Sequence, residues 1–134
     1  MKIIHLTDTH LVAPPQTLLG LDGRQRLADA VASINAEHAD AELCMVTGDL
    51  THWAEAGAYA ALVDILGGLS IPWHLLIGNH DTRETARVAL PDLPWSPDGF
   101  LHYSFNTSAG RFVVLDTVDA GKAGGRLCEV RLRW

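Results

Sequence analysis

Cysteine is scarce in this 134-residue chain, and long apolar runs are missing from it. Cys44 and Cys128 stand too far apart to form a metal-binding pair such as Cys-x-x-Cys. Because Cys44 lies within an apolar run, we interpret it as a buried thiol in a reducing, cytoplasmic protein. No apolar run approaches the roughly 20 residues of a membrane span, and no charged leader precedes the first apolar run, so we expect no membrane partner.

Basic residues are also in the minority. Ten Lys and Arg stand against sixteen Asp and Glu, which gives a formal net charge of −6. This balance argues against a nucleic-acid polymer as partner, because binding its phosphates requires a basic face. The remaining composition, 48% hydrophobic and 19% charged, is typical of a globular protein, and we expect one domain over residues 1–134.

Short apolar runs alternate with segments of helical periodicity. The expected strands cover residues 2–7, 42–47 and 72–77, and the expected helices cover residues 24–38, 55–66 and 82–89. This alternation predicts an α/β fold with a parallel sheet, since parallel strands need crossover helices. A hairpin over 101–107 and 111–116 is expected to follow, and then a helix over 126–134 with Leu127, Val130 and Trp134 on one face.

Each of the three expected strands ends in polar residues. These are Asp8-Thr9-His10, Gly48-Asp49 and Gly78-Asn79-His80-Asp81. Parallel strands bring their carboxyl ends to one edge of a sheet, where ligands bind. We predict that Asp8 and His10 hold one divalent metal ion, that Asp49 bridges it to a second, and that Asn79 is a ligand of the second. Mixed oxygen and nitrogen donors suit Fe, Mn, Zn or Co.

The neighbouring residues are candidates for substrate contacts. Two metal ions can neutralise a phosphate ester and lower the pKa of a bound water. His80 is then placed to contact the phosphate or the leaving oxygen, as an acid or a charge stabiliser, and Asn79 to contact the substrate as well. His52 is either a substrate contact or a solvated loop residue, and Trp53 either packs in the core or lines a pocket. Asp81 either orients His80 or caps the helix that follows, with Glu84 completing a capping box.

Together the three motifs resemble the calcineurin-like metallophosphoesterase superfamily. Within it, Thr47-Gly48-Asp49-Leu50-Thr51 and the Leu-Gly-Leu-Asp-Gly stretch at 19–23 are similar to bacterial class III cyclic-nucleotide and glycerol phosphodiesterases. The resemblance implies an αββα sandwich with a mixed sheet and outer helices. It also implies a metal-bound hydroxide as nucleophile and a small phosphodiester as substrate, either a cyclic nucleotide or a glycerophosphodiester.

The resemblance covers only the N-terminal half of that fold. Family members continue with a further histidine and a Gly-His-x-His segment, which supply imidazoles to both metals. Either the natural chain extends past Trp134, or another chain completes the site, or the chain is an inactive metal-binding or interaction module. Half a sandwich exposes an apolar sheet face, so we expect a homo-oligomer.

Overall fold

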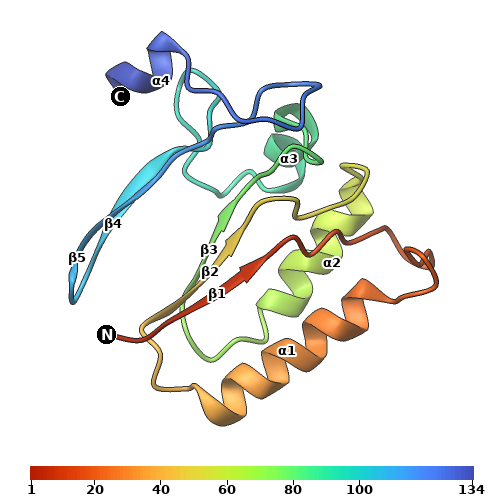
Figure 1. The fold of residues 1–134 in the computed structure, drawn as a ribbon. Coiled ribbons are helices and arrows are strands. Elements are labelled where there is room, and N and C mark those ends of the chain that lie inside the picture. The colour runs from red at the N-terminus through yellow and green to blue at the C-terminus, as the bar shows by residue number, and fades with distance from the viewer.

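Three short apolar runs form the parallel sheet that the sequence predicts. The structure is a computed structural model that describes all 134 residues. The strands are β1 (Ile3–Thr7), β2 (Leu43–Thr47) and β3 (Trp73–Leu76), in the order β1-β2-β3. Both pairs are parallel, with Ile3 opposite Leu43 and Met45 opposite His74. The three carboxyl ends therefore lie at one edge, and β1 and β3 are edge strands (Figure 1).

Two amphipathic helices cover one face of this sheet. They are α1 (Gly23–Glu37) and α2 (Ala56–Leu66), which follow β1 and β2 along the chain (Figure 1). Their apolar stripes enter the core, and the fully or nearly buried helical side chains include Leu27, Val31, Ile34, Leu62 and Leu66. The predicted periodicity of both helices is thus confirmed. None of the four helices has the length and apolar character needed to span a membrane.

The short helix α3 (Arg83–Ala89) begins differently from the prediction. Its N-cap is Thr82, whose hydroxyl oxygen accepts a hydrogen bond from the Thr85 amide. The predicted capping box with Asp81 and Glu84 is therefore wrong. Asp81 is buried, and its carboxylate is engaged elsewhere, which leaves the cap to the next hydroxyl in the chain.

The hairpin of β4 (Tyr103–Thr107) and β5 (Gly110–Val114) lies on the other side of the sheet from α1 and α2 (Figure 1). The ring of Phe105 stacks on His74 at 3.9 Å between centroids, and the Tyr103 hydroxyl donates to the Leu75 carbonyl at 2.8 Å. An open groove remains between this face and β5. It is lined by Ile3, His5, Met45, Thr47, Leu76 and residues 112–115. The apolar face is therefore only partly covered, and β1 has no buried residue despite its apolar sequence: Ile3, Ile4 and Leu6 are half-buried, and His5 and Thr7 are exposed.

The last helix, α4 (Glu129–Arg133), is shorter than predicted and buries a different side chain. Val130 and Trp134 are exposed, whereas Arg131 is 7% exposed. The Arg131 guanidinium donates to the Asp116 carbonyl at 2.9 Å and lies 4.7 Å from the centre of the Phe100 ring. The predicted apolar face of this helix is wrong because the segment packs through an arginine that satisfies buried carbonyl groups.

Candidate metal centre

The loops that follow the three strands are hydrogen-bonded to one another beyond the end of the sheet. The amide of Asp8 donates to the Gly48 carbonyl at 3.2 Å, and the amide of His10 donates to the Asp49 carbonyl at 2.9 Å. On the other side, the amide of Gly48 donates to the Leu76 carbonyl at 2.8 Å. The parallel ladder thus continues into the predicted motifs and places them side by side.

Three of the four predicted metal ligands come together at this edge. His10 Nε2 lies 4.0 Å from Asp8 Oδ1 and 3.7 Å from Asp49 Oδ2. One donor atom from each of the three side chains lies within 4.8 Å of the others. The Asp8 side chain is 57% exposed and that of Asp49 is 13% exposed, so the group opens to solvent on the Asp8 side. Two carboxylates and one imidazole are a fitting donor set for a first-row divalent ion.

The same three residues have an uncommon backbone conformation. Their φ angles are positive, at 54° for Asp8, 43° for His10 and 41° for Asp49. The left-handed region is unfavourable for residues other than glycine, and each instance costs about 1–3 kcal/mol. The ladder hydrogen bonds hold these conformations, which turn the side chains toward a common point. Such strain is concentrated in functional sites, which supports the predicted ligand roles.

The third loop packs directly against the Asp49 backbone. A Cβ atom on Gly78 would lie 2.1 Å from the Asp49 nitrogen, so only glycine fits there. The next contact is a hydrogen bond of 2.9 Å from the His80 amide to Asp49 Oδ1. One oxygen of Asp49 is thus held by the third loop, while the other faces His10. The bridging role of Asp49 stays a prediction.

Asp81 occupies a central, buried position beneath this group. Its carboxylate accepts hydrogen bonds from the amides of Leu50, Thr51 and Gly78 and from the hydroxyls of Thr51 and Tyr59, all at 2.8–3.1 Å. Burial, together with the Asp81 charge, raises the pKa of Tyr59 well above its usual value, so its hydroxyl stays protonated and donates. The prediction that Asp81 orients His80 is wrong, because these backbone and hydroxyl donors use both of its oxygens.

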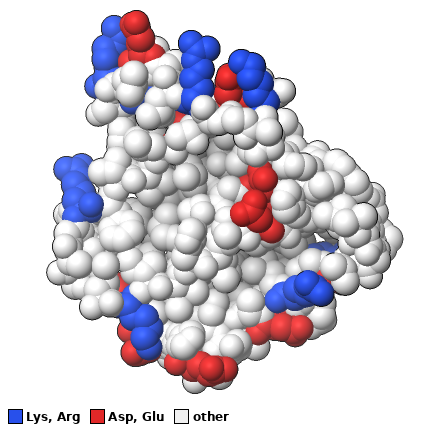
Figure 2. All heavy atoms as spheres, viewed as in Figure 1, with Lys and Arg blue, Asp and Glu red and all other residues white.

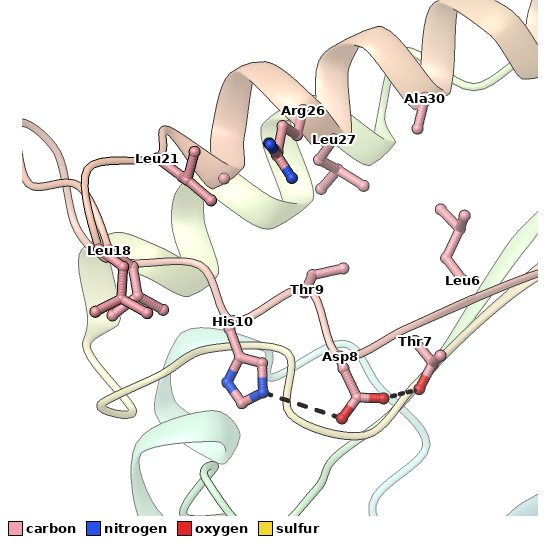
Figure 3. Close-up of a pocket in the computed structure, with 12 residues that line it drawn as sticks. Leu6, Thr7, Asp8, Thr9, His10, Leu18, Leu21, Arg26, Leu27 and Ala30 are labelled. Atoms are coloured by element: carbon pink, nitrogen blue, oxygen red, sulfur yellow. Dashed lines mark hydrogen bonds and ion pairs between the residues drawn. The ribbon is translucent and has the colours of Figure 1, made fainter.

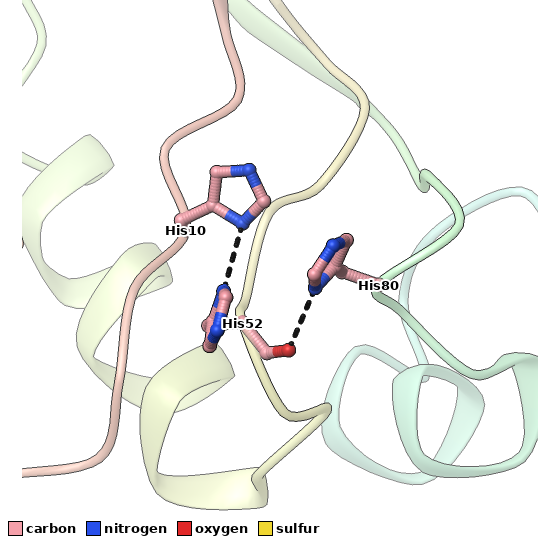
Figure 4. Close-up of side chains that lie close together, drawn as sticks. All are labelled: His10, His52 and His80. Carbon is pink, nitrogen blue, oxygen red and sulfur yellow. Dashed lines mark hydrogen bonds between the residues drawn. The ribbon is translucent and has the colours of Figure 1, made fainter. Parts of the chain in front are cut away.

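His80 is oriented instead by the backbone of His52. The Nδ1 atom of His80 lies 3.0 Å from the His52 carbonyl oxygen, as Figure 4 shows. A carbonyl oxygen only accepts, so this nitrogen carries a hydrogen, and Nε2 is free to face a ligand. The His52 ring is itself close to His10, with their Nδ1 atoms 3.2 Å apart. Burial, followed by the neighbouring imidazoles of His80 and His10, lowers the pKa of His52.

Asn79 and Trp53 lie less centrally. The Asn79 side chain is exposed and lines a separate cavity that Thr7, Gly48 and Gly124 also border. Its predicted role as a ligand of the second metal stays a prediction. Trp53 is 54% exposed beside His52, which contradicts the prediction that it packs in the core.

A cavity of about 340 Å³ adjoins Asp8 and His10 between β1 and α1. Its walls are mostly aliphatic, and Figure 3 shows Leu18 and Leu21 at one end and Leu27 of α1 above the Asp8 loop. Arg26 supplies a cation to the same cavity. No motif in the sequence predicts this pocket. The signal available was the long loop over 11–23, since loops of this length beside a strand end are often functional.

Asp8, His10 and Asp49 thus form a candidate metal-ligand group at the carboxyl edge of a parallel sheet, beside an aliphatic pocket. The sequence model of the calcineurin-like phosphoesterase family matches residues 1–128, and the chain belongs to this family. Membership implies divalent metal ions, for which Asp8, His10 and Asp49 are candidate ligands. The resemblance inferred from the motifs is thus confirmed, as is the α/β fold class.

Several curated proteins are similar to the chain over nearly its whole length. A probable cyclic nucleotide phosphodiesterase of Rhodopseudomonas palustris is 45% identical over 98% of this chain and 49% of its own length. The glycerophosphodiester phosphodiesterase of Enterobacter lignolyticus is 29% identical over 100% of this chain and 50% of its own. A 3′,5′-cyclic AMP phosphodiesterase of Vibrio vulnificus is 28% identical over 98% and 47%. The chain therefore spans about half the length of the curated relatives it matches.

Proposed function

We propose that the chain forms the N-terminal half of a metal-dependent phosphodiesterase that hydrolyses a small phosphodiester. The observation that carries this proposal is the convergence of Asp8, His10 and Asp49, each in a left-handed conformation, at one edge of the sheet. The names of the relatives support a diester, either a cyclic nucleotide or a glycerophosphodiester. On the face drawn in Figure 2, basic side chains lie singly among acidic ones, which favours a small substrate over a nucleic-acid polymer.

In this proposal Asp8 and His10 hold the first metal ion, Asp49 is shared, and Asn79 serves the second. The ions would be two of Fe, Mn, Zn or Co, and they would supply positive charge that neutralises the phosphate and acidifies water. Asp49 is suited to its role because the His80 amide fixes one of its oxygens and leaves the other facing His10.

His80 contacts the phosphate in the proposed reaction. With both ring nitrogens protonated, it donates Nδ1–H to the His52 carbonyl and Nε2–H to a phosphate oxygen. The carbonyl thereby orients the ring before substrate arrives, which lowers the entropic cost of the contact. Substrate contacts from Asn79, which lines the neighbouring cavity, and from His52 remain part of the proposal.

The aliphatic cavity beside Asp8 is placed to receive the organic part of the ester. Leu18, Leu21 and Leu27 offer apolar contact, and Arg26 offers a cation for an anionic or polar substituent. Such a division, with apolar walls and a few polar groups, is typical of small-molecule sites. Replacing Leu27 by Ala should raise KM for a nucleotide or glycerol diester more than for bis(p-nitrophenyl) phosphate, which is not matched to the pocket.

The test of the proposed function combines metal analysis with turnover. Purified protein should hold divalent metal and hydrolyse bis(p-nitrophenyl) phosphate, Asp49→Ala should lose tight binding of both ions, and His80→Ala should keep metal but lose turnover. Unchanged metal content in Asp49→Ala would refute the bridging role, and full activity of His80→Ala would remove His80 from the reaction.

A second candidate is a partner-completed or inactive metal-binding module. It is favoured by the two edge strands β1 and β3 and by the half-covered apolar groove beside β5, since open edges and apolar faces pair with other chains. One bound metal or none, without turnover, would favour this module over the enzyme. A homo-oligomer, which we also propose, would be contradicted by light scattering that reports a soluble monomer. The proposed location is the cytoplasm.

A further inference from the structure

Three imidazoles meet on the side of His10 that faces away from the carboxylates. His10, His52 and His80 follow β1, β2 and β3 respectively, so each comes from a different loop (Figure 4). Their ring centroids lie 4.7–5.2 Å apart, and one nitrogen atom from each lies within 4.8 Å of the others. We propose that these residues form a zinc site that shares His10 with the carboxylate group of Asp8, His10 and Asp49.

The distance between the first two nitrogens already fits a tetrahedral zinc ion. With Zn–N bonds of about 2.0–2.1 Å, two ligand nitrogens of a tetrahedral site stand about 3.3 Å apart. The Nδ1 atoms of His10 and His52 are 3.2 Å apart. In the metal-free pair one of these atoms carries the hydrogen between them, and in the zinc complex both rings carry their hydrogen on Nε2. The separation of the two nitrogens therefore does not have to change for zinc to bind.

The third ligand is oriented by the chain itself. Because His80 donates its Nδ1 hydrogen to the His52 carbonyl, the lone pair of the neutral ring is on Nε2. Ligand histidines in zinc sites commonly donate their other N–H to a backbone carbonyl, which fixes the tautomer and the ring plane. Here the residue that supplies the carbonyl, His52, also supplies a ligand ring. Three neutral imidazoles with no carboxylate suit zinc better than manganese or magnesium.

His10 belongs to both groups through different nitrogen atoms. Its Nε2 faces Asp8 and Asp49 at 4.0 and 3.7 Å, whereas its Nδ1 faces His52 at 3.2 Å. A neutral imidazole has one unprotonated nitrogen, so it can serve the carboxylate group or the imidazole group, but not both. Zinc bound by the three imidazoles therefore leaves an Nε2 hydrogen pointing at the carboxylates and withdraws His10 from the other ion. The two groups therefore compete for His10, and the choice of tautomer weakens metal binding by the carboxylate group.

Zinc affinity measured by competition with a chromophoric chelator tests the site. The measurement uses the purified protein carrying Asp8→Asn, which weakens the carboxylate group, with and without His52→Ala. We expect zinc binding to weaken by about tenfold or more on His52→Ala, since even outer-shell changes cost 10–100-fold. The matched control is His38→Ala, which removes a histidine from the far end of α1 and should leave the affinity unchanged. Equal zinc affinities with and without His52→Ala would overturn the proposal.

A second measurement needs no variant and no turnover. In the wild-type protein, saturating zinc should shift the Nδ1 resonance of His52 in ¹⁵N NMR and release Mn²⁺ from the carboxylate group, as read by the EPR signal of free Mn²⁺. An unchanged His52 resonance would equally rule the site out. Absence of phosphodiesterase turnover would count against the proposed function alone, because neither zinc measurement depends on it.

Discussion

Replacing Gly78 by Ala should disturb the metal centre through a single methyl group. The added Cβ would lie 2.1 Å from the nitrogen and 2.3 Å from Oδ1 of Asp49, where ordinary contacts begin at 3.4 Å. The third loop must therefore move by more than about 1 Å. Overpacking of this kind costs about 1–3 kcal/mol. Loss of the charge-assisted bond from the His80 amide to Asp49 adds about 1.5–3 kcal/mol.

We expect the variant to lose about 3 kcal/mol of unfolding free energy, measured by urea unfolding followed by circular dichroism. We also expect it to bind Mn²⁺ at least about tenfold more weakly than the wild type. Two other glycines serve as controls. Gly124→Ala meets no atom within 4 Å and should match the wild type, whereas Gly48→Ala has free space but a φ of +70° and should lose about 1–2 kcal/mol from strain alone. If Gly78→Ala behaves like Gly124→Ala, the packing of the third loop on Asp49 is refuted.

Three further predictions concern buried or perturbed groups. Asp81→Asn places an amide NH₂ group against the N–H and O–H donors that bond to the carboxylate in the wild type. This variant should lose at least about 2 kcal/mol of unfolding free energy, measured by urea unfolding. Burial lowers the pKa of His102 below 6.5. The unfolded chain then binds more protons, so the wild-type unfolding free energy should fall as pH drops below about 6.5, and His102→Phe should flatten that fall. Hydrogen bonds from the Arg131 amide and guanidinium lower the pKa of the Cys128 thiol to about 7, whereas burial raises the pKa of the Cys44 thiol to about 11. Iodoacetamide should therefore label Cys128 with a midpoint near pH 7 and should not label Cys44 in the folded protein.

Each of these has an outcome that contradicts it. Asp64→Asn, on the exposed side of α2, is the control for Asp81→Asn. Equal unfolding free energies of the two variants would contradict the structural role of the buried Asp81 carboxylate. A pH profile of His102→Phe that overlays the wild type would show that the histidine is solvated. Mass spectrometry that finds Cys44 alkylated as fast as Cys128 in the folded protein would contradict its burial.

The sheet and the first half of the site were predictable because their signals are local. An apolar run that stops at Gly48-Asp49 marks a strand end by itself, and the parallel order brings its neighbours Asp8 and His10 to the same edge. The periodicity of α1 needs only residues within one helix. Such patterns depend on the rise and twist of single elements, which adjacent residues determine.

The remainder depends on contacts between distant residues. Asp81 follows a histidine and precedes a helix, so a cap was the nearest local explanation, but its donors come from positions 50, 51 and 59 as well as Gly78. Arg131 is buried because its guanidinium donates a hydrogen bond to the backbone carbonyl of Asp116. No pattern within α4 predicts this contact, because Asp116 lies outside the helix. The meeting of His52 with His10 likewise depends on two loops whose side chains turn toward each other only in the fold.

Asp81 supports the loops of the candidate metal centre but is not one of its candidate ligands. Its carboxylate ties the loops after β2 and β3 to α2, yet it makes no hydrogen bond to the side chains of Asp8, His10 or Asp49. Substitutions of the Asp8 or His10 side chain should therefore leave the hydrogen bonds of Asp81 intact. The same sheet edge is a ready starting point for redesign, in which ligand identity is varied freely while Asp81 and its partners are left untouched.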